Sequence, residues 1–410
     1  MRRCAGISLL LALASLLAAG PAGAAPTVAD TFDLSGQPGR ITEGPDGNVW
    51  VLLSGSSDNN EIARVEPDGT VTEFDSNDLS NAVGITTGPD GKLWVTKSQA
   101  VGSFDPADPT NIDLTPITQV SGQDIVAGPD GDLWTPGDAT VVQIPPDDPA
   151  NPLFHDVSGL SGRGIAAGGD GRIWVVDFAG QQLVRMKTDG TFTTIAIGGQ
   201  PQQVAAGPGE QMAYTNPNAA DTVVGLLTPP ADPENVAMPN TDPFGITFAI
   251  DGAYWTARFA ANDLARITPD GKLTPLGGFP ASSGPRYLTP GENGTLWVSL
   301  ETSHQVGEVT GIEAPKPPKA PKVKITKAPK SKVKTKGKKK AKVKFAFKSK
   351  TKGVKFRCSL EKRNKRPHFG GCSSPEIYRL KPGKYEFEVK AKAGGVTGKP
   401  ATADFKVVKG

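Results

Sequence analysis

The 410 residues carry a formal net charge of only +3, from 45 lysines and arginines against 42 aspartates and glutamates. This near balance conceals two parts of opposite charge. Residues 313–410 hold 31 basic and 6 acidic residues, a net of +25, whereas the preceding part, without Arg2 and Arg3, holds 12 and 36, a net of −24. Beyond the first 24 residues no stretch is long and apolar enough to span a bilayer, which excludes a protein of several transmembrane helices.

Residues 1–24 show the order of features typical of a secretory signal peptide. Arg2 and Arg3 precede the apolar run ISLLLALASLLAAG, and the segment ends in small residues at positions 22–24. Cys4 precedes the apolar run, which is the wrong end for a lipid-attached cysteine. The sequence therefore predicts an exported protein that is secreted, extracellular or associated with the cell wall.

One phrase then recurs seven times: an aliphatic residue, a turn, an aliphatic residue and Trp. The turn is Gly-Pro-Asp-Gly in the first three copies and a variant of it in the others. The copies begin at residues 41, 85, 125, 165, 204, 246 and 288, and all except the fifth, VAAGPGEQMA, keep the Trp. A period of about 40 residues indicates a helical array or a propeller blade.

The residues inside each repeat decide between these two architectures. Runs of β-branched and aromatic residues alternate with Asp-Gly turns, and no stretch has the spacing of a long amphipathic helix. Each repeat is therefore a small antiparallel sheet, and seven such units predict an all-β fold, a seven-bladed β-propeller over residues 25–312. The tryptophans are expected to pack between blades.

The two ends of the repeat region predict how the ring closes. Residues 28–34, VADTFDL, resemble the strand that ends the other repeats, yet they precede the first copy. The last copy stops after residues 305–311, QVGEVTG, and lacks that strand. We expect residues 28–34 to complete the seventh blade, so that no sheet edge stays open.

A Pro/Lys-rich linker at residues 313–322 separates the ring from the basic part. In residues 323–410 apolar residues occupy every second position, as in Val343, Phe345 and Phe347, which predicts a small immunoglobulin-like β-sandwich. In an exported chain Cys358 and Cys372 are expected to form a disulfide that stabilises this domain by about 3 kcal/mol. Its charge favours an anionic cell-wall polymer as partner and no specific nucleic acid; docking on the acidic ring is the alternative.

The repeat phrase resembles that of the streptogramin B (virginiamycin B) lyase family over about residues 28–311. The resemblance implies a seven-bladed propeller and, for activity, a Mg²⁺-dependent lyase with a Glu-Pro-His cluster and a second Pro-His. At those positions this chain has Gly284-Pro285-Arg286 and Pro243-Phe244. Only Glu301 falls near the family's remaining carboxylate, and one carboxylate is too few for a cation that prefers several oxygen ligands.

In a radial array the residue two positions before each aliphatic anchor points toward the same channel mouth. These residues are Gly39, Val83, Gln123, Arg163, Gln202, Phe244 and Arg286, with Arg40, Asp124, Gln203 and Tyr287 next to them. The ligand-binding candidates among them are Arg40, Gln123, Arg163, Gln202, Phe244, Arg286 and Tyr287. Arginine suits contact with carboxylate or phosphate, so a small or peptide-like anionic ligand is expected; the alternative is that the arginines pair with carboxylates of the ring.

A second set of positions follows each Trp strand, and here the chain keeps a single carboxylate. The set is Leu53, Lys97, Gly137, Asp177, Asn216, Arg258 and Leu300. We therefore expect no metal site and no cofactor, and His155 and His368 are predicted to be surface residues.

These observations favour an exported binding or interaction protein over an enzyme. The alternative is a lyase-like (carbon-oxygen lyase) or hydrolase activity at the channel mouth, with Glu301, His304 and Asp177 as catalytic candidates and Mg²⁺ as the cofactor that the resemblance implies.

Overall fold

The computed structural model describes residues 25–410 apart from 56–59, 219–221, 316–318, 337–339 and 394. The predicted signal peptide, residues 1–24, and part of the predicted linker lie outside the described residues. The chain divides into two compact units, one of them Gly23–Pro315 and the other containing Lys316–Gly410. No helix in the described part is long and apolar enough to cross a membrane.

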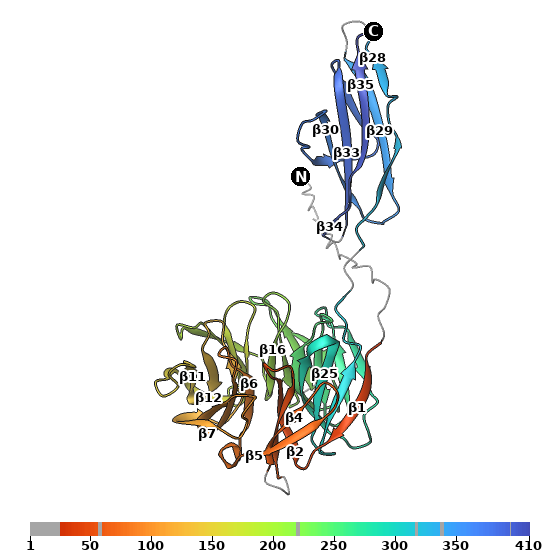
Figure 1. The fold of residues 1–410 in the computed structure, drawn as a ribbon. Coiled ribbons are helices and arrows are strands. Elements are labelled where there is room, and N and C mark those ends of the chain that lie inside the picture. Colours follow the sequence, from red (N-terminus) through yellow and green to blue (C-terminus); the bar gives the residue numbers. More distant parts are fainter. Residues whose placement is uncertain (1–24, 56–59, 219–221, 316–318, 337–339, 394) are drawn as a thin grey trace, which may run out of the picture. The chain divides into compact units, whose positions relative to one another are not determined.

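The first unit is a ring of seven antiparallel blades, as predicted (Figure 1). Blade one contains β2 (Gln37–Glu43), β3 (Val49–Ser54), β4 (Asn60–Val65) and β5 (Val71–Asp75); blade two contains β6 (Gly84–Thr87), β7 (Leu93–Phe104) and β8 (Asp113–Ser121). Blade three contains β9 (Val126–Ala127), β10 (Leu133–Pro136), β11 (Asp138–Ile144) and the first part of β12 (Leu153–Ala167). Blade four contains the rest of β12 with β13 (Ile173–Asp177), β14 (Gln182–Met186) and β15 (Phe192–Ala196).

The remaining three blades complete the ring. Blade five contains β16 (Gln203–Ala206), β17 (Met212–Asn216), β18 (Val223–Leu227) and β19 (Glu234–Ala237); blade six contains β20 (Pro243–Phe248), β21 (Tyr254–Arg258), β22 (Asp263–Ile267) and β23 (Leu273–Leu276). Blade seven contains β24 (Pro285–Gly291), β25 (Thr295–Leu300), β26 (Gln305–Thr310) and β1 (Thr27–Asp33). Two 3₁₀ turns, η1 (Asn77–Leu79) and η2 (Glu292–Gly294), lie in connections.

The ring closes through its first strand. β1 pairs antiparallel with β26, from Thr27 opposite Thr310 to Asp33 opposite Gln305. The ring of Phe32 lies 5.9 Å from the ring of Trp297, so side-chain packing supports the backbone pairing. The predicted closure by residues 28–34 is confirmed.

The Gly, Asp and Trp residues of the repeated phrase contact one another within a copy. In the first copy the indole N–H of Trp50 donates to Asp46 at 3.1 Å, and the same bond recurs in four further blades at 3.0–3.3 Å. A Cβ on Gly44 would lie 2.6 Å from the Trp50 indole, so the first glycine leaves room for the ring. Gly47 has φ +77°, which the tight turn requires.

Each tryptophan is buried between its own blade and the next. Trp50 packs in one cluster with Ile85 and Phe104 of blade two, and Trp297 packs with Ile41 and Val51 of blade one. The prediction of packing between blades is confirmed. In blade five Ala213 takes the Trp position and packs in one cluster with Tyr254 of blade six, whose hydroxyl donates to the backbone oxygen of Gln211 at 3.3 Å. The neighbouring Tyr214 faces the other way and packs with Trp174 of blade four.

The second unit consists of two facing sheets, β27-β29-β32 and β28-β35-β33-β30-β31, with β34 paired to β33. The strands are β27 (Val323–Lys327), β28 (Lys332–Lys334), β29 (Ala341–Ser349), β30 (Lys355–Lys362), β31 (Gly370–Cys372), β32 (Glu376–Leu380), β33 (Gly383–Ala393), β34 (Val396–Thr397) and β35 (Ala401–Val408). Phe345 and Phe387 stack at 3.9 Å in the shared core. Cys358 and Cys372 form the predicted disulfide; the immunoglobulin-like arrangement stays a prediction.

Candidate functional site

Large and small residues alternate where the seven inner strands approach the channel. The position immediately before each aliphatic anchor holds, in ring order, Arg40, Gly84, Asp124, Gly164, Gln203, Gly245 and Tyr287. A Cβ on Gly164 would lie 2.8 Å from the Cα of Gln203, and one on Gly245 would lie 2.5 Å from the carbonyl oxygen of Arg286. The glycines therefore let neighbouring blades approach closely, and the four large side chains share the central space.

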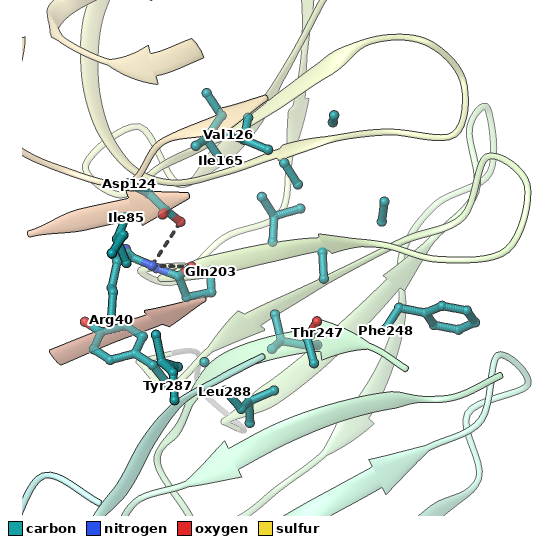
Figure 2. Close-up of a pocket in the computed structure, with 18 residues that line it drawn as sticks. Arg40, Ile85, Asp124, Val126, Ile165, Gln203, Thr247, Phe248, Tyr287 and Leu288 are labelled. Carbon is teal, nitrogen blue, oxygen red and sulfur yellow. Dashed lines mark hydrogen bonds and ion pairs between the residues drawn. The ribbon is translucent and has the colours of Figure 1, made fainter. Parts of the chain in front are cut away.

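Arg40 joins these large side chains into one polar cluster. Its Nη1 lies 2.9 Å from the Oδ2 of Asp124 and donates to the Oε1 of Gln203 at 3.2 Å (Figure 2). Its guanidinium lies 4.8 Å from the centre of the Tyr287 ring. The side chains of Arg40 and Asp124 are 11% and 13% exposed. Burial raises the pKa of Asp124, and the charge of Arg40 offsets part of this shift.

A cavity of about 320 Å³ adjoins this cluster and is lined by all seven blades. Arg40, Asp124, Gln203 and Tyr287 contribute its polar wall, while aliphatic residues such as Ile165 contribute the apolar wall (Figure 2). This volume lies near the lower limit of small-molecule sites, which are about 300–1,000 Å³. The channel can therefore accept only a small ligand or one end of a larger one.

Arg286 forms a second cluster beside the first. Its Nη1 lies 2.6 Å from the Oε2 of Glu301, and its guanidinium lies 4.1 Å from the centre of the Phe244 ring and 5.9 Å from that of Phe259. Phe244 and Tyr287 meet edge to face at 5.6 Å. Burial alone would lower the pKa of Arg286, but Tyr287 and Glu301 outweigh it and raise this pKa. Two aromatic rings thus lie between two arginines, each paired with a carboxylate.

The structure brings only some of the predicted mouth residues together. Arg163 lies 4.3 Å from the centre of the Phe178 ring, and among the described residues it has no salt bridge. Gln202 is 6% exposed and bonds its own segment at Gln200. Gln123 accepts a hydrogen bond from Thr96 through its backbone oxygen. No contact in the described part joins these three residues to Arg286.

The aromatic partners Phe178 and Phe259 were not predicted, although a regular sequence spacing within each blade could have indicated such contacts. Arg163 and Phe178 are 15 positions apart, as are Arg286 and Glu301 within blade seven. Each pair joins the start of an inner strand to the residue just after the next strand of the same blade. The spacing therefore predicts contacts within a blade, whereas those between blades, such as Arg286 with Phe259, require the closed ring.

The residues considered for catalysis or metal binding lie apart from one another or already form hydrogen bonds within the ring. Asp177 is 2% exposed and accepts from the backbone N–H groups of Ser161 and Gly180 and from the side chain of Gln182. His304 is exposed in a turn with φ 53°, and its carbonyl oxygen accepts from Leu34. Among the described residues no three His, Cys, Asp or Glu side chains are grouped to hold a metal ion.

His155, predicted to be a surface residue because it follows a Pro-rich segment typical of a loop, lies in a strand and is only partly exposed. It lies in β12, half-buried, with its ring stacked at 5.1 Å on Trp134 and its Nε2 at 2.8 Å from Gln143. Burial lowers the pKa of His155. The Pro-rich sequence before it suggested a loop, but the strand continues through it. His368 is exposed, as expected.

The fold and this channel define a seven-bladed propeller with a closed ring and a polar channel mouth. The family model of the virginiamycin B lyase family matches residues 25–228 and 156–329. The chain therefore belongs to the virginiamycin B lyase family. No curated protein matches it.

Solved structures show the same propeller fold at low sequence identity. A streptogramin B lyase is 20% identical, with 68% of this chain and 96% of that chain covered and a TM-score of 0.60. A catalytically inactive virginiamycin B lyase from Staphylococcus aureus, solved with quinupristin, is 19% identical over 68% and 98%, with a TM-score of 0.61. The extracellular domain of a hybrid two-component system of B. thetaiotaomicron is 16% identical over 92% and 55%, with a TM-score of 0.51. These identities establish the fold alone.

Proposed function

We propose that the propeller is an exported binding module that takes a small anionic ligand at its channel mouth and does not catalyse the lyase reaction of its family. The observation that carries this proposal is the pair of Arg286 and Glu301. Arg286 stands where the resemblance places a general base, and its guanidinium cannot accept a proton at neutral pH. Glu301, the carboxylate that remains, is bonded to it at 2.6 Å.

The donor groups at this site do not fit the Mg²⁺ ion that the resemblance implies. Mg²⁺ prefers several oxygen ligands in octahedral geometry. The carboxylate of Glu301 faces a guanidinium, and that of Asp177 is held by its own blade. A cation at Glu301 would have to displace Arg286 or lie beside its positive charge, so the residues present do not fit a Mg²⁺ site.

The ligand is inferred from the groups that line the mouth. Arg286 offers a guanidinium donor for a carboxylate or phosphate, and Phe244 and Tyr287 offer aromatic surface for an apolar part. Arg163, in blade four, is a second candidate donor, which the ligand itself would have to link to Arg286. The ligand anion would compete with Glu301 for Arg286. Binding should therefore be moderate, and it should respond to the charge of residue 301.

Matched small molecules test this ligand class. N-acetylated amino acids with apolar side chains, such as N-acetylphenylalanine, are expected to raise the melting temperature of the propeller more than their amides do. Arg286→Ala or Arg163→Ala should weaken binding by about tenfold or more, because a charge-assisted hydrogen bond contributes about 1.5–3 kcal/mol. Glu301→Gln should strengthen it. Equal effects of acids and amides, or no effect of Glu301→Gln, would refute the anionic ligand.

Family membership supports one alternative, a streptogramin B lyase activity. Incubation of the purified protein with a streptogramin B antibiotic and Mg²⁺ is expected to leave the antibiotic intact. Clear turnover, lost in Glu301→Gln and His304→Ala variants, would replace the binding proposal with an enzymatic one.

Export is the second part of the proposal. The order of charged, apolar and small residues in 1–24 supports it, as do structural neighbours that are extracellular domains. Mass spectrometry of the protein recovered from culture medium or cell wall should find a new N-terminus near Ala25. An intact Met1 on protein confined to the cytoplasm would overturn this part.

A further inference from the structure

One face of the C-terminal unit carries only positive charge. On the sheet β27-β29-β32 the outward positions alternate with core residues such as Phe345, which is fully buried. We call the outward cations of this sheet the lysine face; they are Lys324, Lys327, Lys342, Lys344, Lys348 and Arg379, and all six are exposed.

Like charges stand directly opposite each other on the lysine face. Lys324 is the cross-strand partner of Lys348, and Lys342 is the partner of Arg379. Such pairs destabilise a sheet. The only acidic residue of the three strands, Glu376, alternates with the outward positions and stands opposite Phe345. Among the described residues no salt bridge involves any cation of this face.

The other sheet of the same unit has a mixed face. Like-charge pairs occur here too, with Lys384 opposite Lys406 and Glu386 opposite Asp404, but cations and acids share this face, whereas the lysine face holds cations alone. Interspersed charges are the usual way to keep a surface soluble. If the lysines served only solubility, we would expect them to be mixed with acidic residues on both sheets. Their grouping without acidic residues on one sheet indicates a different role for the lysine face.

We propose that the lysine face binds a linear acidic polysaccharide. Lys342, Lys344 and Lys348 lie along a run of about 20 Å on β29, and Lys327 of the neighbouring strand stands opposite Ala346, the outward position of β29 without a charge. This row of cations suits a chain with repeated anions. Ile377 is 47% exposed opposite Lys344 and offers an apolar contact to the carbon faces of sugar rings. This inference is independent of the ligand proposed for the propeller.

The composition of the face favours a polysaccharide over a nucleic acid. Binding of single strands uses aromatic side chains on which bases stack. Phe345, Phe347 and Tyr378 on these strands point into the core, so the face presents no aromatic ring.

The test uses the full-length protein and polygalacturonate, a linear polymer with one carboxylate per sugar, with fully methyl-esterified polygalacturonate as the uncharged control. The wild type should bind the acid form at low salt and release it at about 1 M salt, where the screening length is about 3 Å. It should not bind the ester. The triple variant Lys342→Gln, Lys344→Gln and Lys348→Gln should bind about tenfold more weakly, because exposed ion pairs each contribute a fraction of a kcal/mol.

A matched triple variant on the other sheet, Lys384→Gln, Lys392→Gln and Lys406→Gln, removes the same charge and should bind as the wild type does. Circular dichroism of both variants should show an unchanged fold. Equal loss in the two variants would mean that net charge alone attracts the polymer and would overturn the proposal. Retention of the ester, no retention of the acid form at low salt, or tighter binding of duplex DNA than of polygalacturonate would overturn it as well.

Discussion

Replacing Arg40 with methionine leaves the carboxylate of Asp124 in the channel without its cation, while the apolar stem of the side chain is kept. Breaking a buried ion pair by removing one partner costs about 3–5 kcal/mol, because an uncompensated charge remains. The two side chains are 11% and 13% exposed, which places the expected loss near the lower end, about 3 kcal/mol. For a ring of this size, with an unfolding entropy of about 0.6 kcal/mol/K, that corresponds to a fall in Tm of about 5 °C.

The loss should depend on pH with a defined sign. Burial raises the folded-state pKa of Asp124 above its unfolded value, and Arg40 lowers it, so Arg40→Met raises it further. A carboxyl with a raised folded pKa contributes stability at low pH and loses it as pH rises through that pKa. The deficit of the variant should be smallest at acidic pH, where Asp124 is protonated in both proteins, and should grow toward neutral pH.

Tryptophan fluorescence is a selective assay, because all six tryptophans lie between residues 50 and 297 and none lies in the C-terminal unit. Lys92→Met is the control: the Lys92–Asp113 pair spans 3.2 Å, but its side chains are 41% and 73% exposed, so its loss should leave Tm nearly unchanged. The double variant Arg40→Met and Asp124→Leu should recover most of the stability. If Arg40→Met melts like the wild type at all pH values, Arg40 is not a structural partner of Asp124 and is free for a ligand.

Three further predictions concern the scaffold. Asp90→Ala removes the acceptor of the Trp94 indole at 3.0 Å and should destabilise the ring by about 1–2 kcal/mol; an unchanged melting temperature would show that the bond is dispensable. Phe32→Ala removes the contact of β1 with Trp297, should cost about 2 kcal/mol and should raise hydrogen exchange in β1 and β26 first; a uniform rise across the ring would contradict a local effect at the closing strand pair. Reduction of the single disulfide should destabilise the C-terminal unit by about 3 kcal/mol without moving the tryptophan transition, and a moved transition would mean that the two units unfold together.

The blades and their closure were predictable because each repeat contains the residues that pack it. The Asp-Gly turn, the glycine before it and the Trp four residues after the Asp form one local unit, and five copies show the same indole bond. The last repeat lacks its final strand, and one extra strand precedes the first repeat. The sequence therefore predicted that the extra strand completes the last blade. Alternation in residues 341–347 likewise predicted the strand β29.

The partners of the mouth residues were less predictable because they come from distant blades. Arg40 in blade one contacts Asp124 in blade three and Gln203 in blade five, which are 84 and 163 positions away. The spacing of residues within one blade cannot predict these contacts between blades. The sequence left open whether the arginines bind a ligand or pair with carboxylates, and the structure pairs Arg40 and Arg286 with Asp124 and Glu301.

This pairing bears directly on what the channel mouth can do. A general base needs a free lone pair, and the position that the resemblance assigns to the base holds Arg286, which is a permanent donor. Glu301 lies 2.6 Å from that donor and offsets its charge, so the proposed anion would have to compete with Glu301 for Arg286, whereas Arg163 has no salt bridge among the described residues. In the proposed binding role, we therefore expect the mouth to prefer ligands whose anionic group reaches Arg286 while an apolar part packs on Phe244. An arginine at the position of a base would donate where a base accepts, so under this proposal the blade geometry would hold a ligand without moving a proton.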